Sequence, residues 1–174
     1  KFNKKTIVSI FLNPKQFGAN EDLSTYPRNE VADIAALNSR GVHLLFAPSS
    51  KEMYSREFVT KIAVPGIGDV LEGASRPDFF AGVATVVAKL LIQTLPDRAF
   101  FGEKDLQQLH VIKRMVVDLN IPVKIIGCPT IREADGLALS SRNAYLSASE
   151  RINAAALFKA LNQVSQRVLH GGLI

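Results

Sequence analysis

The sequence predicts an α/β protein with a Rossmann-like parallel sheet flanked by helices. Short segments rich in β-branched and apolar residues alternate with longer segments of helical periodicity. Because parallel strands need crossover connections, and helices usually supply them, this alternation favours a parallel sheet. The 174-residue chain is 47% hydrophobic and 21% charged, which is typical of a folded domain and argues against intrinsic disorder.

Each predicted strand is short, apolar and followed by a polar loop. The predicted strands are residues 6–12, 43–47, 98–101 and 123–127, with 58–64 as a less regular candidate. The predicted helices are residues 29–40, residues 78–94, a segment after Asp105 and a C-terminal segment after Ser147. Asp78 is expected to cap the helix 78–94, which is apolar nearly all round and is therefore expected to be buried.

The pattern of the chain changes after Cys128, and we place a domain boundary near residue 130. Residues 1–130 carry the alternating strands and helices of the predicted Rossmann-like domain. Residues 131–174 begin with a polar, irregular segment and continue with an amphipathic helix, which Ser147 and Glu150 open as a capping box. With about one helix, this second unit is too small to build a core by itself.

Composition and charge restrict the possible partners. The net charge of +5 suits anionic ligands, but the positive residues are scattered and form no Lys/Arg block, so we expect no nucleic-acid partner. The longest apolar run, 79–92, is interrupted by Lys89, so we expect no membrane partner. The single cysteine, Cys128, excludes an internal disulfide framework and a multi-cysteine zinc site, and it is consistent with the cytoplasm.

Three loops contain candidate functional residues. In a parallel α/β sheet, ligands bind at the carboxyl ends of the strands. Loop 13–18 follows the first strand, and the Gln16 amide can bind a hydroxyl or a carboxylate. Loop 102–105 precedes a helix whose free N–H groups favour phosphate, and Lys104 is placed to stabilise a transferring phosphoryl group. In segment 132–143, two serines and Arg142 form a compact anion-binding group.

Each of these loops also has a purely structural interpretation. Loop 13–18 could be an ordinary polar loop without a ligand. Segment 132–143 could be a solvated loop between two domains. In loop 102–105, Asp105 would be the N-cap of the next helix and Gln108 its capping-box partner. The three histidines have no metal-ligand spacing, and no Ser/His/Asp or Cys/His set is evident, so the pattern points to no catalytic nucleophile.

Taken together, the loops resemble the pantoate–β-alanine ligase family of the nucleotidyltransferase superfamily. The longest matching motifs are 11–18 (FLNPKQFG), 72–77 (EGASRP), 80–83 (FAGV), 101–105 (FGEKD), 132–138 (READGLA) and 140–143 (SSRN). Shorter matches lie at 21–23, 26–28, 46–49 and 107–109. They follow the order and spacing of the family from Thr6 to about Arg151, and several long motifs in register are much more specific than one short pattern.

The resemblance implies an ATP-dependent condensation of (R)-pantoate with β-alanine. The pantoate carboxylate would attack the α-phosphorus of ATP to form pantoyl adenylate and pyrophosphate. The β-alanine amine would then attack the acyl carbon and release AMP. Such a reaction requires neutralised phosphate charge and exclusion of water from a reactive anhydride. The resemblance also implies Mg²⁺, a cytoplasmic homodimer and a place in the synthesis of coenzyme A.

Residue roles carried over from the family fall into three groups. The resemblance assigns ATP to residues of the second and third loops, namely Gly102, Glu103, Lys104, Asp105, Ile131, Leu139, Ser140, Ser141 and Arg142. Four of these would be catalytic: Lys104, Ser140, Ser141 and Arg142. Asn13, Gln16 and Gln108 would bind pantoate and β-alanine, and Asp33 is a candidate Mg²⁺ ligand. Residues 131–174 would be the beginning of a lid that closes over the triphosphate.

The sequence also departs from the family pattern. The family has a Pro-Thr-Met-Gly segment and a His-x-Gly-His motif before the strand at 6–12, and its lid continues beyond one helix. This sequence contains neither motif and begins with Lys1. We therefore expect a portion of a longer enzyme that lacks the N- and C-terminal parts of the family fold. The alternatives are an inactive fragment that only binds nucleotide or dimerises, and another nucleotidyltransferase of the same superfamily.

Overall fold

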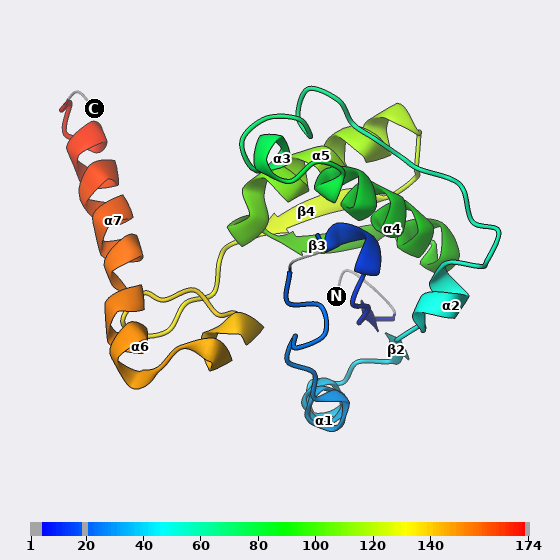
Figure 1. Ribbon diagram of the computed structural model, residues 1–174, viewed down its shortest axis with the longest axis horizontal. Helices are drawn as coiled ribbons and strands as arrows, with labels where there is room; N and C mark the ends of the chain where they lie inside the picture. Colours follow the sequence, from blue (N-terminus) through cyan, green and yellow to red (C-terminus); the bar gives the residue numbers. More distant parts are fainter. Residues whose placement is uncertain (1–4, 19–20, 173–174) are drawn as a thin grey trace. The chain divides into compact units, whose positions relative to one another are not determined.

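The computed structural model describes residues 5–18 and 21–172, which form two compact units, Lys1–Cys128 and Pro129–Ile174 (Figure 1). The described residues contain no helix that is both long and apolar enough to cross a membrane. In the first unit, short helices and turns accompany the main elements: η1 (Pro14–Gln16), α2 (Ser50–Met53), α3 (Glu72–Ser75) and η2 (Glu103–Asp105). The longer elements are considered below.

The strands of the first unit pair in parallel, as the sequence predicts. Strand β1 (Ile7–Ser9) pairs with β2 (Leu44–Phe46), and β3 (Arg98–Gly102) pairs with β4 (Lys124–Cys128). Within the described residues these are two separate two-stranded sheets, rather than the single sheet expected. Strand β1 is also shorter than predicted: its register with β2 ends at Ser9, opposite Phe46, and the N–H of Ile10 makes the last bond, to the Phe46 carbonyl at 3.0 Å.

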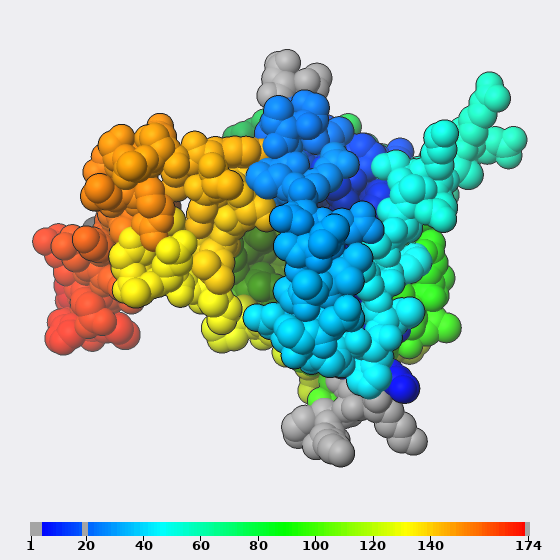
Figure 2. Space-filling model, turned by 90° about the horizontal axis from the view of Figure 1, so that it is seen from below, coloured from blue at the N-terminus to red at the C-terminus, as the bar shows by residue number. Residues whose placement is uncertain are grey.

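The core of the first unit lies around α4 (Phe79–Thr94) and α5 (Leu106–Asp118). Ten of the sixteen residues of α4 are buried, which confirms the prediction from its apolar sequence. Its buried side chains and those of α5 form one apolar cluster: Phe80, Val83, Ala84, Val86, Val87, Ala88, Leu91, Val111, Ile112, Met115 and Val116, joined by Met53 of α2. By contrast, α1 (Glu30–Ser39) has no buried residue and lies on the surface, in blue in Figure 2.

Two local predictions around α4 are wrong. Asp78 precedes the helix but has a left-handed backbone, with φ of 68°, and its side chain caps nothing; it forms an ion pair with Lys61 at 2.5 Å. Residues 58–64 are not a strand. The N–H of Ile62 donates to the hydroxyl of Thr85 at 2.9 Å, so this segment is tied to α4 rather than to a neighbouring strand. The buried Thr85 of α4 thus takes the hydrogen bond that a neighbouring strand would otherwise accept from Ile62.

The second unit contains η3 (Ser141–Tyr145), α6 (Ala148–Ala154) and α7 (Ala156–Leu169). The predicted capping box is confirmed: the Ser147 hydroxyl accepts from the N–H of Glu150, and the Glu150 carboxylate accepts from the N–H of Ser147 at 2.8 Å. The single predicted helix is divided into two at Ala155. The apolar stripe of α7 remains exposed in the described chain: Leu157, Leu161, Val164 and Val168.

Candidate functional site

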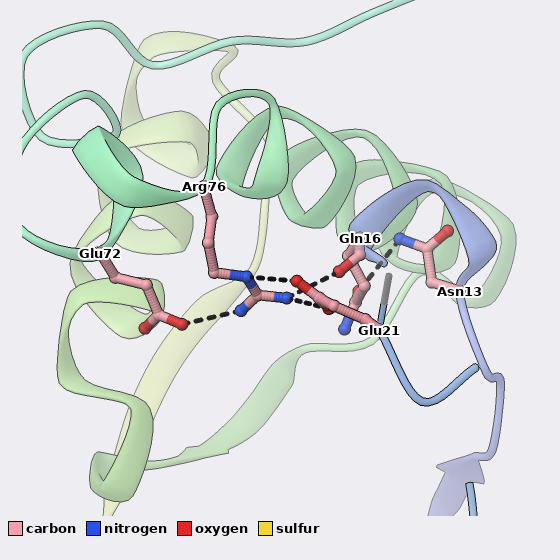
Figure 3. A network of polar contacts seen from close by, with 5 residues as sticks. All are labelled: Asn13, Gln16, Glu21, Glu72 and Arg76. Carbon is pink, nitrogen blue, oxygen red and sulfur yellow. Dashed lines mark hydrogen bonds and ion pairs between the residues drawn. The ribbon is translucent and has the colours of Figure 1, made fainter. Parts of the chain in front are cut away.

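The loop that follows β1 is organised around Asn13, which is only 2% exposed. The Asn13 carbonyl oxygen accepts from the N–H of Lys15 at 3.2 Å and from the hydroxyl of Tyr54 at 2.7 Å. Its amide nitrogen donates to the carbonyl of Gly82 at 3.1 Å and to Oε1 of Gln16 at 3.0 Å (Figure 3). The Asn13 side chain is therefore fully hydrogen-bonded to the protein, so we interpret Asn13 as a support for Gln16; its direct contact with a ligand stays a prediction.

The bond from Asn13 fixes which end of the Gln16 amide faces outward. Because Oε1 of Gln16 already accepts a hydrogen bond, Nε2 is the end left to bind a ligand, and it has no protein partner among the described residues. An amide nitrogen only donates hydrogen bonds. Gln16 therefore suits a ligand that presents an acceptor, such as a carboxylate or a hydroxyl oxygen.

Tyr54 and Gly82 hold this loop. No sequence pattern indicated Tyr54, and Gly82 lies in the matched segment 80–83 without a predicted role. Burial raises the pKa of Tyr54 to about 12, so its phenol is neutral and donates to Asn13. Helix α4 passes so close to η1 that a Cβ built on Gly82 would lie 2.3 Å from the carbonyl oxygen of Lys15. Only glycine fits there without displacing the backbone. A glycine within an apolar helix was the one available signal, because it marks a close approach.

Arg76 is a further residue that the sequence analysis did not single out. Its guanidinium donates to the backbone carbonyl of Gln16 at 3.2 Å and to both carboxylate oxygens of Glu21, at 2.8 and 2.5 Å (Figure 3). It also forms an ion pair with Glu72, four residues before it, at 2.7 Å. Thus the Gln16 loop is held through its side chain by Asn13 and through its backbone by Arg76.

The second candidate loop lies at the carboxyl ends of β3 and β4, where Gly102 is opposite Cys128. Lys104 and Asp105 are exposed in η2, and the Lys104 ammonium has no protein partner among the described residues. Asp105 precedes α5 but makes no side-chain cap, and no capping box joins it to Gln108. Asp105 does stand at the predicted N-cap position of α5, but the side-chain hydrogen bonds of the structural interpretation are absent. The half-buried Gln108 side chain and the Lys104 ammonium are left available for a ligand.

Gln107, next to Gln108, connects α5 with the α3 segment. Its amide nitrogen donates to the carbonyls of Ile67 and Val70, at 2.8 and 2.7 Å, and its Oε1 accepts from the N–H of Glu72 at 3.3 Å. No hydrogen bond between described residues joins Gln16 directly to Gln108. The polar contacts of Arg76, Glu72 and Gln107 instead lead from the backbone of Gln16 to the first turn of α5, which also carries Gln108.

The third candidate loop belongs to the second unit. Arg132 and Ala138 form an antiparallel bridge around a turn at Gly136, where φ is +95°. The Arg132 guanidinium donates to the Gly136 carbonyl at 3.1 Å and stacks on the Phe158 ring of α7 at 4.0 Å. Arg151 of α6 binds both Glu133 and Asp135, and these contacts lower the pKa of Asp135. The loop is therefore a folded structure, not a loose connection.

The predicted anion group lies at the end of this loop. Ser140 is the N-cap of η3, with its hydroxyl accepting from the N–H of Arg142 at 3.2 Å. Ser141 and Arg142 follow within the same helix and are exposed. The two remaining predicted ATP residues, Ile131 and Leu139, are exposed and joined by a backbone hydrogen bond of 3.0 Å. The predicted residues of this loop thus lie close together.

The candidate metal ligand, Asp33, lies on the surface of the first unit. Asp33 is exposed in the first turn of α1. Among residues 5–18 and 21–172, no three His, Cys, Asp or Glu side chains gather in a way that could hold a metal ion. Mg²⁺ binding by Asp33 stays a prediction.

Comparison with known proteins identifies the family of the chain. The model of the pantoate-beta-alanine ligase family matches residues 1–172. The chain belongs to this family. The resemblance in the motifs of all three loops is thereby confirmed, and the parallel strands flanked by helices are the fold of the solved ligases considered next.

Pantoate–β-alanine ligases of known sequence and structure are similar to nearly the whole chain. The pantothenate synthetase of Caulobacter vibrioides is 56% identical over 171 residues, which are 98% of this chain and 60% of that protein. The solved pantothenate synthetase of Thermus thermophilus is 51% identical, with a TM-score of 0.96 over 98% of this chain and 62% of its own. The chain thus spans about three fifths of the length of these relatives.

A third relative was solved with ligands. It is the pantoate-beta-alanine ligase of Francisella tularensis, complexed with beta-gamma ATP and beta-alanine. It is 44% identical to this chain, with a TM-score of 0.87 over 92% of this chain and 62% of its own.

Proposed function

We propose that the complete gene product containing this chain condenses (R)-pantoate with β-alanine at the expense of ATP. The observation that carries this proposal is the fixed Gln16 amide, whose nitrogen faces outward because Asn13 binds its oxygen. A donor held in this direction suits the carboxylate and hydroxyl oxygens of pantoate. Membership in the ligase family supports pantoate and β-alanine as substrates, and the ligands of the Francisella relative support ATP and β-alanine.

The reaction proceeds in two steps in this proposal. A pantoate carboxylate oxygen bonds to the α-phosphorus of ATP, and the bond from that phosphorus to pyrophosphate breaks. The amine nitrogen of β-alanine then bonds to the acyl carbon, the bond from that carbon to AMP breaks, and the nitrogen loses a proton. The products are pantothenate, AMP, pyrophosphate and one proton, so atoms and charge balance.

Lys104 supplies positive charge to the first step. Its ammonium is unpaired among the described residues and lies between β3 and α5, where exposed N–H groups of a helix start also favour phosphate. Several anions meet in this reaction, so a positive charge beside the transferring phosphate would stabilise the transition state strongly. We assign Gly102, Glu103 and Asp105 to the same ATP loop, and Gln108 to pantoate.

The second unit contributes the remaining ATP contacts in this proposal. Ser140, Ser141 and Arg142 bind phosphate oxygens, and Ile131 and Leu139 contact the nucleotide. This assignment is supported by the turn at Gly136, which precedes η3. Arg132 of this turn stacks on Phe158, and Arg151 binds Glu133 and Asp135, so the turn is fixed within the second unit. We also propose that the enzyme acts as a cytoplasmic homodimer on the route to coenzyme A, and that ATP enters with Mg²⁺.

The deciding experiment is an assay of AMP formation by the purified complete gene product. We expect AMP to form only when ATP, pantoate and β-alanine are all present, and pantoate with ATP alone to give a single turnover of pyrophosphate. Other acids and amines serve as controls. AMP formation that does not depend on pantoate would indicate a different nucleotidyltransferase, and no AMP from any pair would indicate an inactive nucleotide-binding protein.

A further inference from the structure

We propose that Arg76 is a positioning residue that holds Gln16 in place for its substrate. This inference rests on the proposed function, because it assigns Arg76 to the geometry of the pantoate-binding amide. Arg76 lies just before α4, 60 residues from Gln16 in the sequence, and its Nη2 donates to the Gln16 backbone carbonyl at 3.2 Å. The contact fixes the main chain from which the Gln16 side chain projects.

The shape of the guanidinium explains why position 76 needs an arginine rather than a lysine. Nε and Nη2 bind the two oxygens of Glu21, Nη1 binds Glu72, and Nη2 also reaches Gln16 (Figure 3). The guanidinium also stacks on the Phe79 ring, with its central carbon 3.8 Å from the ring centroid. A planar group with five fixed donors can satisfy all these partners at once, whereas a lysine ammonium cannot.

The charges around Arg76 argue against a direct role in binding an anionic substrate. Two carboxylates, Glu21 and Glu72, contact its one positive charge. The cluster therefore carries a net negative charge and repels a carboxylate or phosphate. Burial lowers the pKa of Arg76, but the two glutamates outweigh this effect and raise it, so the guanidinium stays charged. Its part in this cluster is to support the loop.

The same cluster connects Gln16 with the helix that carries Gln108. Glu72 binds Arg76 through its carboxylate, and its backbone N–H donates to Gln107. Gln107 in turn binds two backbone carbonyls of the loop before α3. One set of polar contacts thus joins the backbone of Gln16 to the helix turn that carries Gln108. An error of about 1 Å in the placement of such groups can cost about 10²-fold in rate.

The experiment is steady-state kinetics of Arg76→Met and Arg76→Lys in the complete gene product. We expect Arg76→Met to raise the KM for pantoate about 10-fold or more, with the KM for ATP changed less than about 2-fold. Arg76→Lys should recover little of this loss, because it restores the charge but not the fork of donors. Glu21→Gln is a milder variant and should raise the same KM by a smaller factor.

Arg114→Met is the matched control. Arg114 also forms an ion pair with an acidic residue, Asp118, but on the exposed side of α5, so its loss should leave both KM values unchanged. Hydrogen exchange of the peptide that contains residues 13–18 supplies a second readout, which should become faster in Arg76→Met and not in Arg114→Met.

The outcomes separate this inference from the proposed function. If the wild-type protein forms AMP only with pantoate, but Arg76→Met folds and keeps the wild-type KM for pantoate, the positioning role is refuted and the proposed function stands. Equal increases in the KM values for ATP and pantoate would also refute it. If the wild type shows no dependence on pantoate, the proposed function itself fails.

Discussion

Gly82→Ala is the sharpest test of how α4 holds the Gln16 loop. The added Cβ would lie 2.3 Å from the carbonyl oxygen of Lys15, 2.7 Å from its carbonyl carbon and 3.2 Å from the N–H nitrogen of Gln16. All three are backbone atoms, so no side chain can rotate away. Reaching ordinary contact at 3.4 Å requires a movement of 1.1 Å, the difference between 3.4 and 2.3 Å, in either η1 or α4.

The expected cost follows from three contributions. Overpacking of this kind costs about 1–3 kcal/mol. The movement also disturbs the buried hydrogen bond from Asn13 to the Gly82 carbonyl, which contributes about 1 kcal/mol. In the opposite direction, alanine in place of glycine within a helix stabilises by about 1 kcal/mol. We therefore expect the free energy of unfolding to fall by about 1–3 kcal/mol, with Gln16 displaced and the KM for pantoate raised.

Urea denaturation measures the stability change, and Gly102→Ala is its control. Gly102 has φ of −69° and no atom within 4 Å of a built Cβ, so its substitution should leave stability unchanged within about 0.5 kcal/mol. A Gly82→Ala protein more stable than the wild type would refute the reasoning, because it would mean that only the helix preference acts and that η1 is not in contact with α4.

Three further substitutions test other parts of the structure. Lys104→Ala should slow single-turnover adenylate formation by about 10²-fold or more, while the affinity for pantoate, measured by calorimetry, stays near the wild-type value; unchanged adenylation would contradict the assigned role. Tyr54→Phe should cost about 1 kcal/mol in urea denaturation near neutral pH. Because burial raises the folded-state pKa to about 12, above the ordinary 10, the unfolded chain loses its phenolic proton first, so the advantage of wild type over Tyr54→Phe should be complete below pH 10 and disappear between pH 10 and 12. Ser147→Ala should remove the capping box and destabilise α6 by about 1 kcal/mol, with less helical circular dichroism, whereas an unchanged spectrum would mean that the cap is dispensable.

Local patterns predicted the parts of the fold that depend on local interactions. The apolar sequence of α4 and the Ser147–Glu150 capping box concern residues within a few positions of one another, and both are confirmed. The pairing of strands into two sheets and the loss of the 58–64 strand depend on distant partners, such as the Thr85 hydroxyl that binds the N–H of Ile62. Periodicity contains no information about such contacts.

The residues of the candidate site also differ in whether their role could be predicted from nearby sequence. Gln16, Lys104 and Gln108 follow strands or open a helix, so their sequence positions marked them. Arg76, although within the matched segment 72–77, and Tyr54 received no role, because one lies 55 residues from Glu21 and the other 41 residues from Asn13. Asp105 occupies the N-cap position of α5 that its spacing to Gln108 predicted, but its side chain makes no capping hydrogen bond there.

The hydrogen bonds that end at Gln16 have a direction. The Tyr54 hydroxyl donates to Asn13, the Asn13 amide donates to Gln16, and Gln16 donates outward. The Tyr54 hydroxyl, the N–H of Lys15 and the carbonyl of Gly82 together orient the Asn13 amide, so the groups beneath the loop leave it offering a hydrogen and not a lone pair. Gln16→Glu keeps the size of the side chain and can still accept from Asn13, yet it would present a negative oxygen. This isosteric change would then weaken the binding of an acid without altering the scaffold beneath it.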